Sequence, residues 1–183
     1  MAVGQPCRII QVVGYKNAGK TTLIEQITRE LSSKNVTVGV VKHHGHGGEL
    51  VKSADSARFF RAGASVSLVE GEGHVQIDVH SSTSSLDALI QLQQQLQSTS
   101  CVLVEGWKRE DRYASIVIIR DEADFHLLKR NHIMIVITHV PIDRELDVPV
   151  FDYENVHTYV SYIVRYIMKG VIGRDVSTDE RTH

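Results

Sequence analysis

The sequence predicts an α/β fold in which helices flank a mostly parallel sheet and an antiparallel hairpin extends one edge of that sheet. Three observations support this fold class. First, strand-like and helix-like runs alternate along most of the 183 residues, as they do in parallel sheets. Second, a glycine-rich loop joins the first strand-like run to the first helix-like run. Third, the strand-like runs at 65–70 and 74–80 are separated only by Gly71-Glu72-Gly73, which is typical of a hairpin turn.

The first element is a buried strand, because four apolar residues crowd its short run: Ile9, Ile10, Val12 and Val13. After the loop, apolar residues recur at the spacing of one helix face, which predicts a helix from about Thr21 to Ser33. These residues are Leu23, Ile24, Ile27 and Leu31. Residues 36–42 are then almost continuously apolar, as buried parallel strands are.

The middle of the chain departs from simple alternation. Residues 43–48 contain only His and Gly and are expected to form a loop. A short helix is expected to start at Ser53, a capping candidate, and to end before Gly63. The hairpin at 65–80 follows, and we expect it to add antiparallel strands to an edge of the sheet.

The last part of the chain returns to the alternation of strands and helices. A helix is expected from Leu86 to about Gln97, with its glutamines mostly on the solvent side. Its buried stripe is expected to consist of Leu86, Leu89, Ile90, Leu92 and Leu96. Strands are expected at 101–106, 116–119, 133–137 and 148–151, with a closing helix at 156–168. We therefore expect a single nucleotide-binding domain over residues 1–170 and a frayed polar tail over 171–183.

The composition is that of an ordinary globular protein, with 42% hydrophobic and 23% charged residues. A formal net charge of −2 gives no reason to expect nucleic acid as a partner. Cys7 and Cys101, the only two cysteines, are expected to be buried and reduced. No apolar run approaches the roughly 20 residues that a bilayer span needs, and no signal peptide is visible. A cytoplasmic location without membrane association is therefore expected.

The loop after the first strand has the pattern Gly, four residues, Gly-Lys-Thr, which predicts a phosphate-binding loop (P-loop) of the NTPase type. Its glycines let successive amide N–H groups surround phosphate oxygens, and the helix N-terminus adds positive potential. Lys20 is expected to bind the β- and γ-phosphates, Thr21 to coordinate Mg²⁺, and Thr22 to reach the α-phosphate. The loop comprises Gly14, Tyr15, Lys16, Asn17, Ala18, Gly19, Lys20, Thr21 and Thr22.

Two acidic residues are candidates for the metal site and for catalysis beside Lys20. Glu105 ends the apolar run 101–104, where P-loop proteins place an acid that holds Mg²⁺ directly or through water. Its extra methylene, compared with Asp, favours an outer-shell role. Asp55 follows the histidine-rich loop and is a candidate that approaches the nucleotide from the opposite side. The alternatives are an ordinary turn residue for Glu105 and helix capping for Asp55.

Three histidines, His43, His44 and His46, follow the second strand at the carboxyl edge, where ligands of open α/β sheets gather. We weigh three roles for them: a phosphate-facing or substrate-facing loop, a solvated loop, and a transition-metal site. Structural zinc sites usually draw on spaced Cys and His pairs, which this sequence lacks. The lone tryptophan, Trp107, opens a densely charged loop at 107–112 that could move with nucleotide state, meet a partner or simply be solvated.

Base selection is not decided by these motifs. Many guanine-specific proteins carry Asn-Lys-x-Asp after a strand, so that the aspartate accepts hydrogen bonds from the guanine base. Residues 137–143, Ile-Thr-His-Val-Pro-Ile-Asp, follow the right kind of strand but match that motif poorly. The chemistry of the sequence leaves guanine and adenine both open.

Four segments together resemble the molybdopterin-guanine dinucleotide biosynthesis protein B (MobB) family. They are GYKNAGKTTL, VGVVKHHGH, KSADSARFFRAGA and VLVEGWK. The resemblance runs from about Arg8 to Arg120 and continues more loosely to about Lys169. Two departures are Trp107, where the family more often has Phe, and Lys52, which Ser53 and Ala54 separate from the Asp55-Ser56 pair.

The resemblance implies a GTP-binding accessory protein of molybdenum cofactor maturation. Members are weak GTPases that form dimers and associate with the guanylyltransferase that joins GMP to molybdopterin. Carried onto this chain, GTP and Mg²⁺ bind at the P-loop, with Glu105 and Asp55 near the metal. His43 and His46 are implied to lie on the phosphate or substrate side.

Other functions remain open from the sequence. One is an adaptor in which the nucleotide is regulatory and protein association does the work. A metallochaperone GTPase is suggested by the histidines, and a P-loop kinase for a small metabolite by Arg109 and Arg112. The absence of an arginine-rich lid segment speaks against the kinase.

Overall fold

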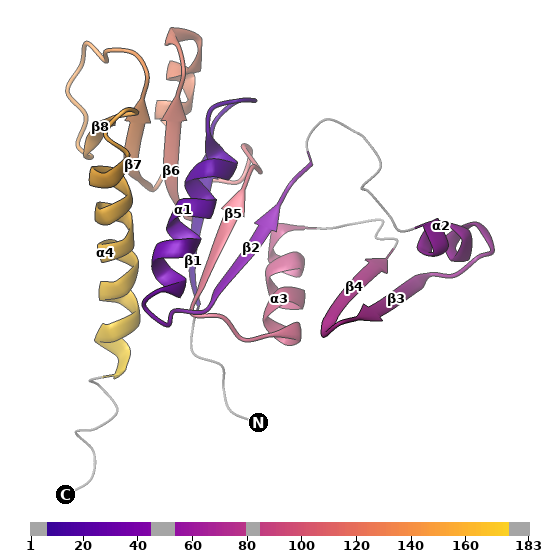
Figure 1. The fold of residues 1–183 in the computed structure, drawn as a ribbon. Helices are drawn as coiled ribbons and strands as arrows, with labels where there is room; N and C mark the ends of the chain where they lie inside the picture. The colour runs from indigo at the N-terminus through magenta and orange to yellow at the C-terminus, as the bar shows by residue number, and fades with distance from the viewer. Residues whose placement is uncertain (1–6, 45–53, 80–84, 176–183) are drawn as a thin grey trace, which may run out of the picture. The chain divides into compact units, whose positions relative to one another are not determined.

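The structure is a computed structural model, and it describes residues 7–44, 54–79 and 85–175 (Figure 1). The chain divides into two compact units, one made of residues 1–43 and 89–183 and the other of residues 44–88. Each unit is described by itself below. The expectation of a single domain over residues 1–170 stays a prediction.

The first unit is built on a six-stranded sheet in the order β2-β5-β1-β6-β7-β8, in which every neighbouring pair is parallel. This confirms the predicted α/β class with its parallel sheet. Because β5 lies between β2 and β1, strands distant in sequence become neighbours. The strands are β1 (Arg8–Val13), β2 (Val38–Lys42), β5 (Cys101–Glu105), β6 (Ala114–Ile119), β7 (Ile133–Thr138) and β8 (Val150–Asp152).

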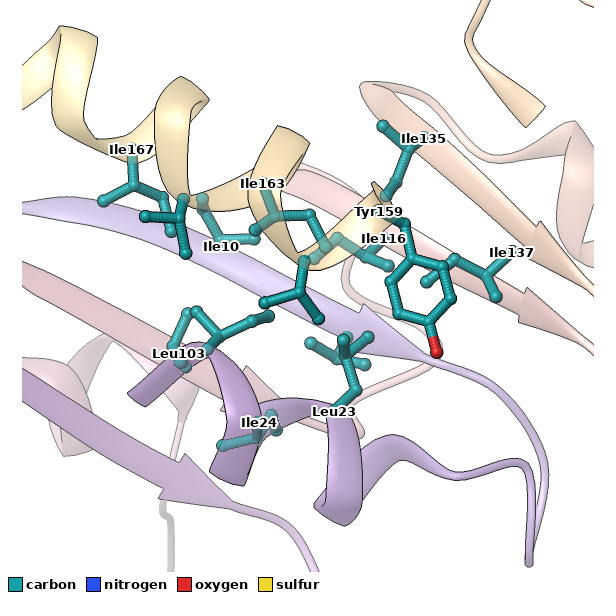
Figure 2. Packing of buried hydrophobic residues seen from close by; sticks show 14 of the residues in the cluster. Ile10, Leu23, Ile24, Leu103, Ile116, Ile135, Ile137, Tyr159, Ile163 and Ile167 are labelled. Atoms are coloured by element: carbon teal, nitrogen blue, oxygen red, sulfur yellow. The ribbon is translucent and has the colours of Figure 1, made fainter. Parts of the chain in front are cut away.

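Helices α1 (Lys20–Ser32) and α4 (Val156–Asp175) pack together on one face of this sheet. Figure 2 shows Ile163 and Ile167 of α4 and Leu23 and Ile24 of α1 converging over strand residues such as Ile10. All of these side chains are at most 5% exposed. The helical spacing read from the sequence therefore gives the buried face of α1 correctly, since Leu23, Ile24, Ile27 and Leu31 are its buried residues.

The opposite face of the sheet carries a second apolar cluster. Side chains alternate between faces along a strand, so Ile116 and Ile118 join the first cluster while Val117 and Ile119 join the second. Leu127 covers the second cluster from a 3₁₀ helix, η1 (Glu122–Lys129), which the sequence analysis did not predict. Asp121 caps this helix by accepting a hydrogen bond from the Ala123 N–H at 3.0 Å.

The second unit contains α2 (Ala54–Arg61), β3 (Val66–Gly71) and β4 (His74–Val79). The predicted hairpin is confirmed, with Val66 opposite Val79 and Gly71 opposite His74. It forms a two-stranded sheet of its own, however, and in the described residues it pairs with no strand of the six-stranded sheet. The hairpin was expected to add strands to an edge of the main sheet, and this detail of the prediction is wrong. α3 (Leu86–Leu96) begins in this unit and continues into the first.

Three details of the expected elements differ from the structure. The closing helix, expected over 156–168, continues to Asp175. Leu92 and Leu96 were expected on the buried side of α3, yet they are 42% and 61% exposed. Cys101 is buried, which raises the pKa of its thiol to about 12, whereas Cys7 is only half-buried. Both cysteines are free.

Candidate functional site

The predicted P-loop, residues 14–22, curls between β1 and α1 and depends on two glycines. Gly19 has φ +83°, a left-handed conformation that glycine adopts without strain. At Gly14 the constraint is space, because a Cβ would lie 3.1 Å from the Ile118 carbonyl oxygen of β6. Asn17 also has a positive φ, 62°, which asparagine tolerates better than most residues. The loop then leads directly into the N-terminus of α1, where free amides favour an anion.

The Lys20 side chain folds back over the loop and donates a hydrogen bond from Nζ to the Tyr15 carbonyl oxygen at 2.6 Å. Burial lowers the pKa of Lys20; Glu105 opposes this shift, and the nearby charges of Lys108 and Lys42 add to it. Lys42 is paired with the Glu105 carboxylate, and Lys20 lies close enough to interact with the charges of Glu105, Lys108 and Lys42. Such an excess of positive charge suits a polyanion such as a nucleoside triphosphate.

Thr21 and Glu105, both predicted as metal ligands, lie side by side. The Thr21 hydroxyl donates to Glu105 Oε2 at 2.9 Å, and Glu105 is only 7% exposed. Hydroxyl and carboxylate oxygens are the hard donors that Mg²⁺ prefers. Two oxygens at this separation also fit adjacent corners of an octahedron with metal–oxygen distances of about 2.1 Å. The residues present therefore fit a Mg²⁺ ion.

Lys42 completes this cluster; the sequence places it at the start of the histidine-rich segment but does not mark it as a site residue. Its Nζ donates to Thr21 Oγ1 at 3.1 Å and forms an ion pair with Glu105 Oε2 at 3.2 Å. The only sequence signal was its place at the carboxyl end of the second strand, where residues of parallel sheets gather around ligands.

The turn after Glu105 is held in an unusual backbone conformation. Gly106 has φ 99° and Trp107 has φ 50°, so two successive residues are left-handed. A Cβ on Gly106 would come within 3.1 Å of the His43 Cβ, which explains the glycine. The rings of His43 and Trp107 lie 4.9 Å apart between centroids. His43, at the end of β2, is thus in contact with the turn that follows the acidic residue.

The side chains of Gln11 and Arg130 fix this turn through hydrogen bonds. The Gln11 amide nitrogen donates to the carbonyl oxygens of Gly106 at 2.7 Å and Trp107 at 2.8 Å. Arg130 donates to Gln11 Oε1 at 3.1 Å and to the carbonyl oxygens of Lys108 and Glu110. Gln11 is fully buried in β1. This network fixes the backbone that presents Lys108, whose Nζ lies 3.6 Å from the centroid of the Tyr15 ring.

We expect Arg130→Met to destabilise the protein by about 1–3 kcal/mol, because it leaves the Gln11 oxygen and two loop carbonyls without their donor. The measurement is the free energy of unfolding in urea. Lys129→Met removes a neighbouring exposed cation and is the control, with an expected change within about 0.5 kcal/mol. Equal stability of the two variants would contradict a structural role for Arg130.

Two residues that the sequence analysis did not name also hold the predicted P-loop: Arg120, directly after β6, and His126 of η1. Arg120 donates to the Lys16 carbonyl oxygen at 2.9 Å. The Tyr15 hydroxyl lies 2.9 Å from His126 Nε2. Neither partner carries a local sequence signal, since both contacts join residues more than a hundred positions apart.

The residues that directly follow β7 and β8 also lie beside the predicted P-loop. His139, in the segment weighed for base recognition, stacks on Tyr153 with 3.7 Å between ring centroids. Tyr153 in turn lies against Gly19, where a Cβ would meet its hydroxyl oxygen at 2.6 Å. A pocket of about 110 Å³ lies here, below the roughly 300–1,000 Å³ of typical ligand sites. His139, which directly follows β7, therefore takes part in an aromatic pair beside Gly19.

The other predicted site residues are not joined to this cluster by the described contacts. Asp55 lies in the second unit, exposed, and pairs with Arg58 of its own helix at 3.8 Å. That pairing fits the alternative of charge balance near a helix N-terminus. His46, Lys52 and Ser53 lie outside the described residues. His44 is described and exposed.

No group of three or more His, Cys, Asp or Glu side chains comes together as a metal site within residues 7–44, 54–79 and 85–175. In the same part of the chain, no helix has both the length and the apolar character that a bilayer crossing requires.

Comparisons with known proteins add independent findings. The model of a family described as "Molybdopterin guanine dinucleotide synthesis protein B" matches residues 9–139. A Bacillus subtilis protein named "Probable molybdopterin-guanine dinucleotide biosynthesis adapter protein" is 41% identical over 140 residues, covering 75% of this chain and 79% of that protein. An Escherichia coli protein named "Molybdopterin-guanine dinucleotide biosynthesis adapter protein" is 26% identical over 175 residues, covering 88% of this chain and 94% of that protein.

Solved structures of MobB proteins have a similar fold. The crystal structure of Bacillus subtilis MobB has a TM-score of 0.75 and 34% identity, covering 86% of this chain and 96% of that chain. A MobB protein homolog from Bacillus stearothermophilus has a TM-score of 0.73 and 31% identity, covering 88% of this chain and 98% of that chain.

Proposed function

The chain belongs to the molybdopterin guanine dinucleotide synthesis protein B family, and we propose that it is an adapter protein that binds GTP with Mg²⁺ and assists the attachment of GMP to molybdopterin. The adapter role comes from the names of its relatives. The partner proposed is the guanylyltransferase that performs the attachment, and molybdopterin is the second ligand of the assembly. The cytoplasmic location expected from the sequence stays a prediction.

The observation that carries the nucleotide proposal is the convergence of the P-loop with Lys20, Thr21 and Glu105. The loop amides, the α1 N-terminus and the Lys20 ammonium group are the groups that would bind a polyphosphate. Thr21 and Glu105 would hold Mg²⁺, which would neutralise phosphate charge. Lys20 and Glu105 are the proposed catalytic residues, and the role of Asp55 stays a prediction.

Calorimetric titration of the whole chain with GTP and with ATP, each with Mg²⁺ and with EDTA, tests this proposal. We expect saturable binding of GTP that strengthens with Mg²⁺. Absence of binding to either nucleotide would refute it, and a clear preference for ATP would refute the choice of guanine.

Hydrolysis is proposed to be slow, because a P-loop protein without a completed catalytic site turns over at about 10⁻⁴ to 10⁻² s⁻¹. Phosphate release from GTP and Mg²⁺ by the purified chain measures this rate. Turnover of tens per second without a partner would contradict an accessory role.

We also propose that the protein is a homodimer and that the β3–β4 hairpin contributes to the interface. Six large apolar side chains of this hairpin are exposed: Val66, Leu68, Val69, Val75, Ile77 and Val79. A two-stranded ribbon with open edges and apolar side chains is marginal in water, and pairing with a second copy would cover it.

Leu68→Glu is expected to shift the protein from dimer to monomer, because it places a charge on this apolar surface. Leu96→Glu is the matched control, since Leu68 is 63% exposed on the hairpin and Leu96 is 61% exposed on α3. Sedimentation velocity measures the oligomeric state. The proposal fails if the wild type is a monomer or if both variants remain dimers.

A further inference from the structure

We infer that the Lys42 ammonium group occupies the cation position between Thr21 and Glu105, so that a divalent cation binding with the nucleotide must displace it. Lys42 would then compete with Mg²⁺, and loading with Mg²⁺ and nucleotide would free the Lys42 side chain from both oxygens. This inference rests on the proposed function, because it concerns the metal that accompanies the nucleotide.

Strand pairing brings the two side chains together. β2 pairs with β5 in parallel, and the register places Lys42 directly opposite Glu105. Paired residues of neighbouring strands point to the same face of a sheet. Here that face carries α1, because Thr21, in the first turn of α1, contacts both side chains. Lys42 is also the last residue of β2, a strand at the edge of the sheet.

The distances describe a closed triangle. Thr21 Oγ1 and Glu105 Oε2 are 2.9 Å apart, and Lys42 Nζ lies 3.1 Å from the first and 3.2 Å from the second. The ammonium group thus contacts the same two oxygens that fit Mg²⁺. It supplies the positive charge that the nearly buried Glu105 carboxylate requires in the absence of metal.

The two cations cannot share this position. Thr21 and Glu105 would hold Mg²⁺ through the same two oxygens that the ammonium group now contacts, so each cation would take the contacts of the other. The charges of a divalent ion and an ammonium group held by the same two oxygens also repel strongly. The lysine can leave, because its side chain is 50% exposed and its stem is flexible.

Displacement of Lys42 would also reach the neighbouring turn. The next residue, His43, donates its backbone N–H to the Glu105 carbonyl oxygen at 2.9 Å, and its ring contacts Trp107. Binding of a metal ion at this position would therefore alter the contacts at the ends of both β2 and β5.

The test measures GTP affinity by calorimetry in EDTA and in saturating Mg²⁺, and takes the ratio of the two dissociation constants as the gain due to metal. In Lys42→Met we expect this gain to be about fivefold or more above that of the wild type, because the competing charge is gone. Lys34→Met is the matched control, since Lys34 is 46% exposed and pairs with Glu30 at 3.9 Å, away from the P-loop. Its gain should equal that of the wild type, and Lys42→Arg, which keeps a cation, should also stay close to it.

Two results for Lys42→Met would overturn the inference. An unchanged gain would mean that Lys42 forms an ion pair with Glu105 but does not compete with Mg²⁺. A smaller gain would mean that Lys42 binds the phosphates or helps the metal to bind. Both leave GTP binding by the wild type intact, so the proposed function survives them. A wild type that binds no nucleotide in either buffer would refute the proposed function and this inference together.

Discussion

Replacing Lys20 with Ala is expected to weaken GTP binding by about 100-fold or more. The half-buried ammonium group is placed over the P-loop by its hydrogen bond to the Tyr15 carbonyl oxygen, and a charge-assisted contact with phosphate in this setting contributes about 2–5 kcal/mol. The loop amides and the α1 N-terminus remain, so weak binding of phosphate should persist. Calorimetric titration with GTP and Mg²⁺ measures the change.

Lys16→Ala is the control for this experiment, because Lys16 lies in the same loop but is exposed, and its backbone carbonyl rather than its side chain contacts Arg120. We expect its affinity to stay within about threefold of the wild type. If Lys20→Ala lost no more affinity than Lys16→Ala, the loop would not bind phosphates as proposed. Unfolding curves of both variants show whether the loss arises from folding instead.

Gly19→Ala should have the second large effect, on both stability and binding. A side chain at φ +83° costs about 1–2 kcal/mol, and its Cβ would lie 2.6 Å from the Tyr153 hydroxyl. Tyr153 is held by stacking on His139, so relieving the overlap would disturb that pair at a further cost of about 1–3 kcal/mol. We expect a total loss of about 2–5 kcal/mol in the free energy of unfolding and at least tenfold weaker GTP binding.

Gly73→Ala separates the two contributions. Gly73 also has a positive φ, 78°, but nothing lies within 4 Å of the place its Cβ would take. It should therefore lose only the conformational part of about 1–2 kcal/mol and keep its GTP affinity. Urea unfolding followed by circular dichroism, together with calorimetry, compares the variants. A Gly19→Ala variant that behaves like Gly73→Ala would contradict the close approach of Tyr153 to the loop.

Most of the elements follow from local patterns. The apolar spacing of α1 gives its buried face because a helix on a sheet must bury one stripe of side chains. The position of Glu105 at the end of a strand was also predictable from a local pattern. A continuous apolar run is typical of a buried strand, and an acidic residue after it indicates where the strand leaves the core. The 3₁₀ helix η1 was missed because its apolar residues, Phe125, Leu127 and Leu128, are too few to show a period.

The sequence by itself determined the glycine-rich loop between β1 and α1 and the places of its two constrained glycines, because those properties depend on the backbone of a few consecutive residues. It also determined the parallel α/β class, because that class follows from the order of elements. Only the tertiary structure decided that Lys42 meets Thr21 and Glu105, that Gln11 and Arg130 hold the turn after Glu105, and that Tyr153 closes on Gly19. Periodicity says which face of an element is buried but not which strand lies beside it. Here β5 lies between β1 and β2, and this strand order places Lys42 of β2 beside Glu105 of β5.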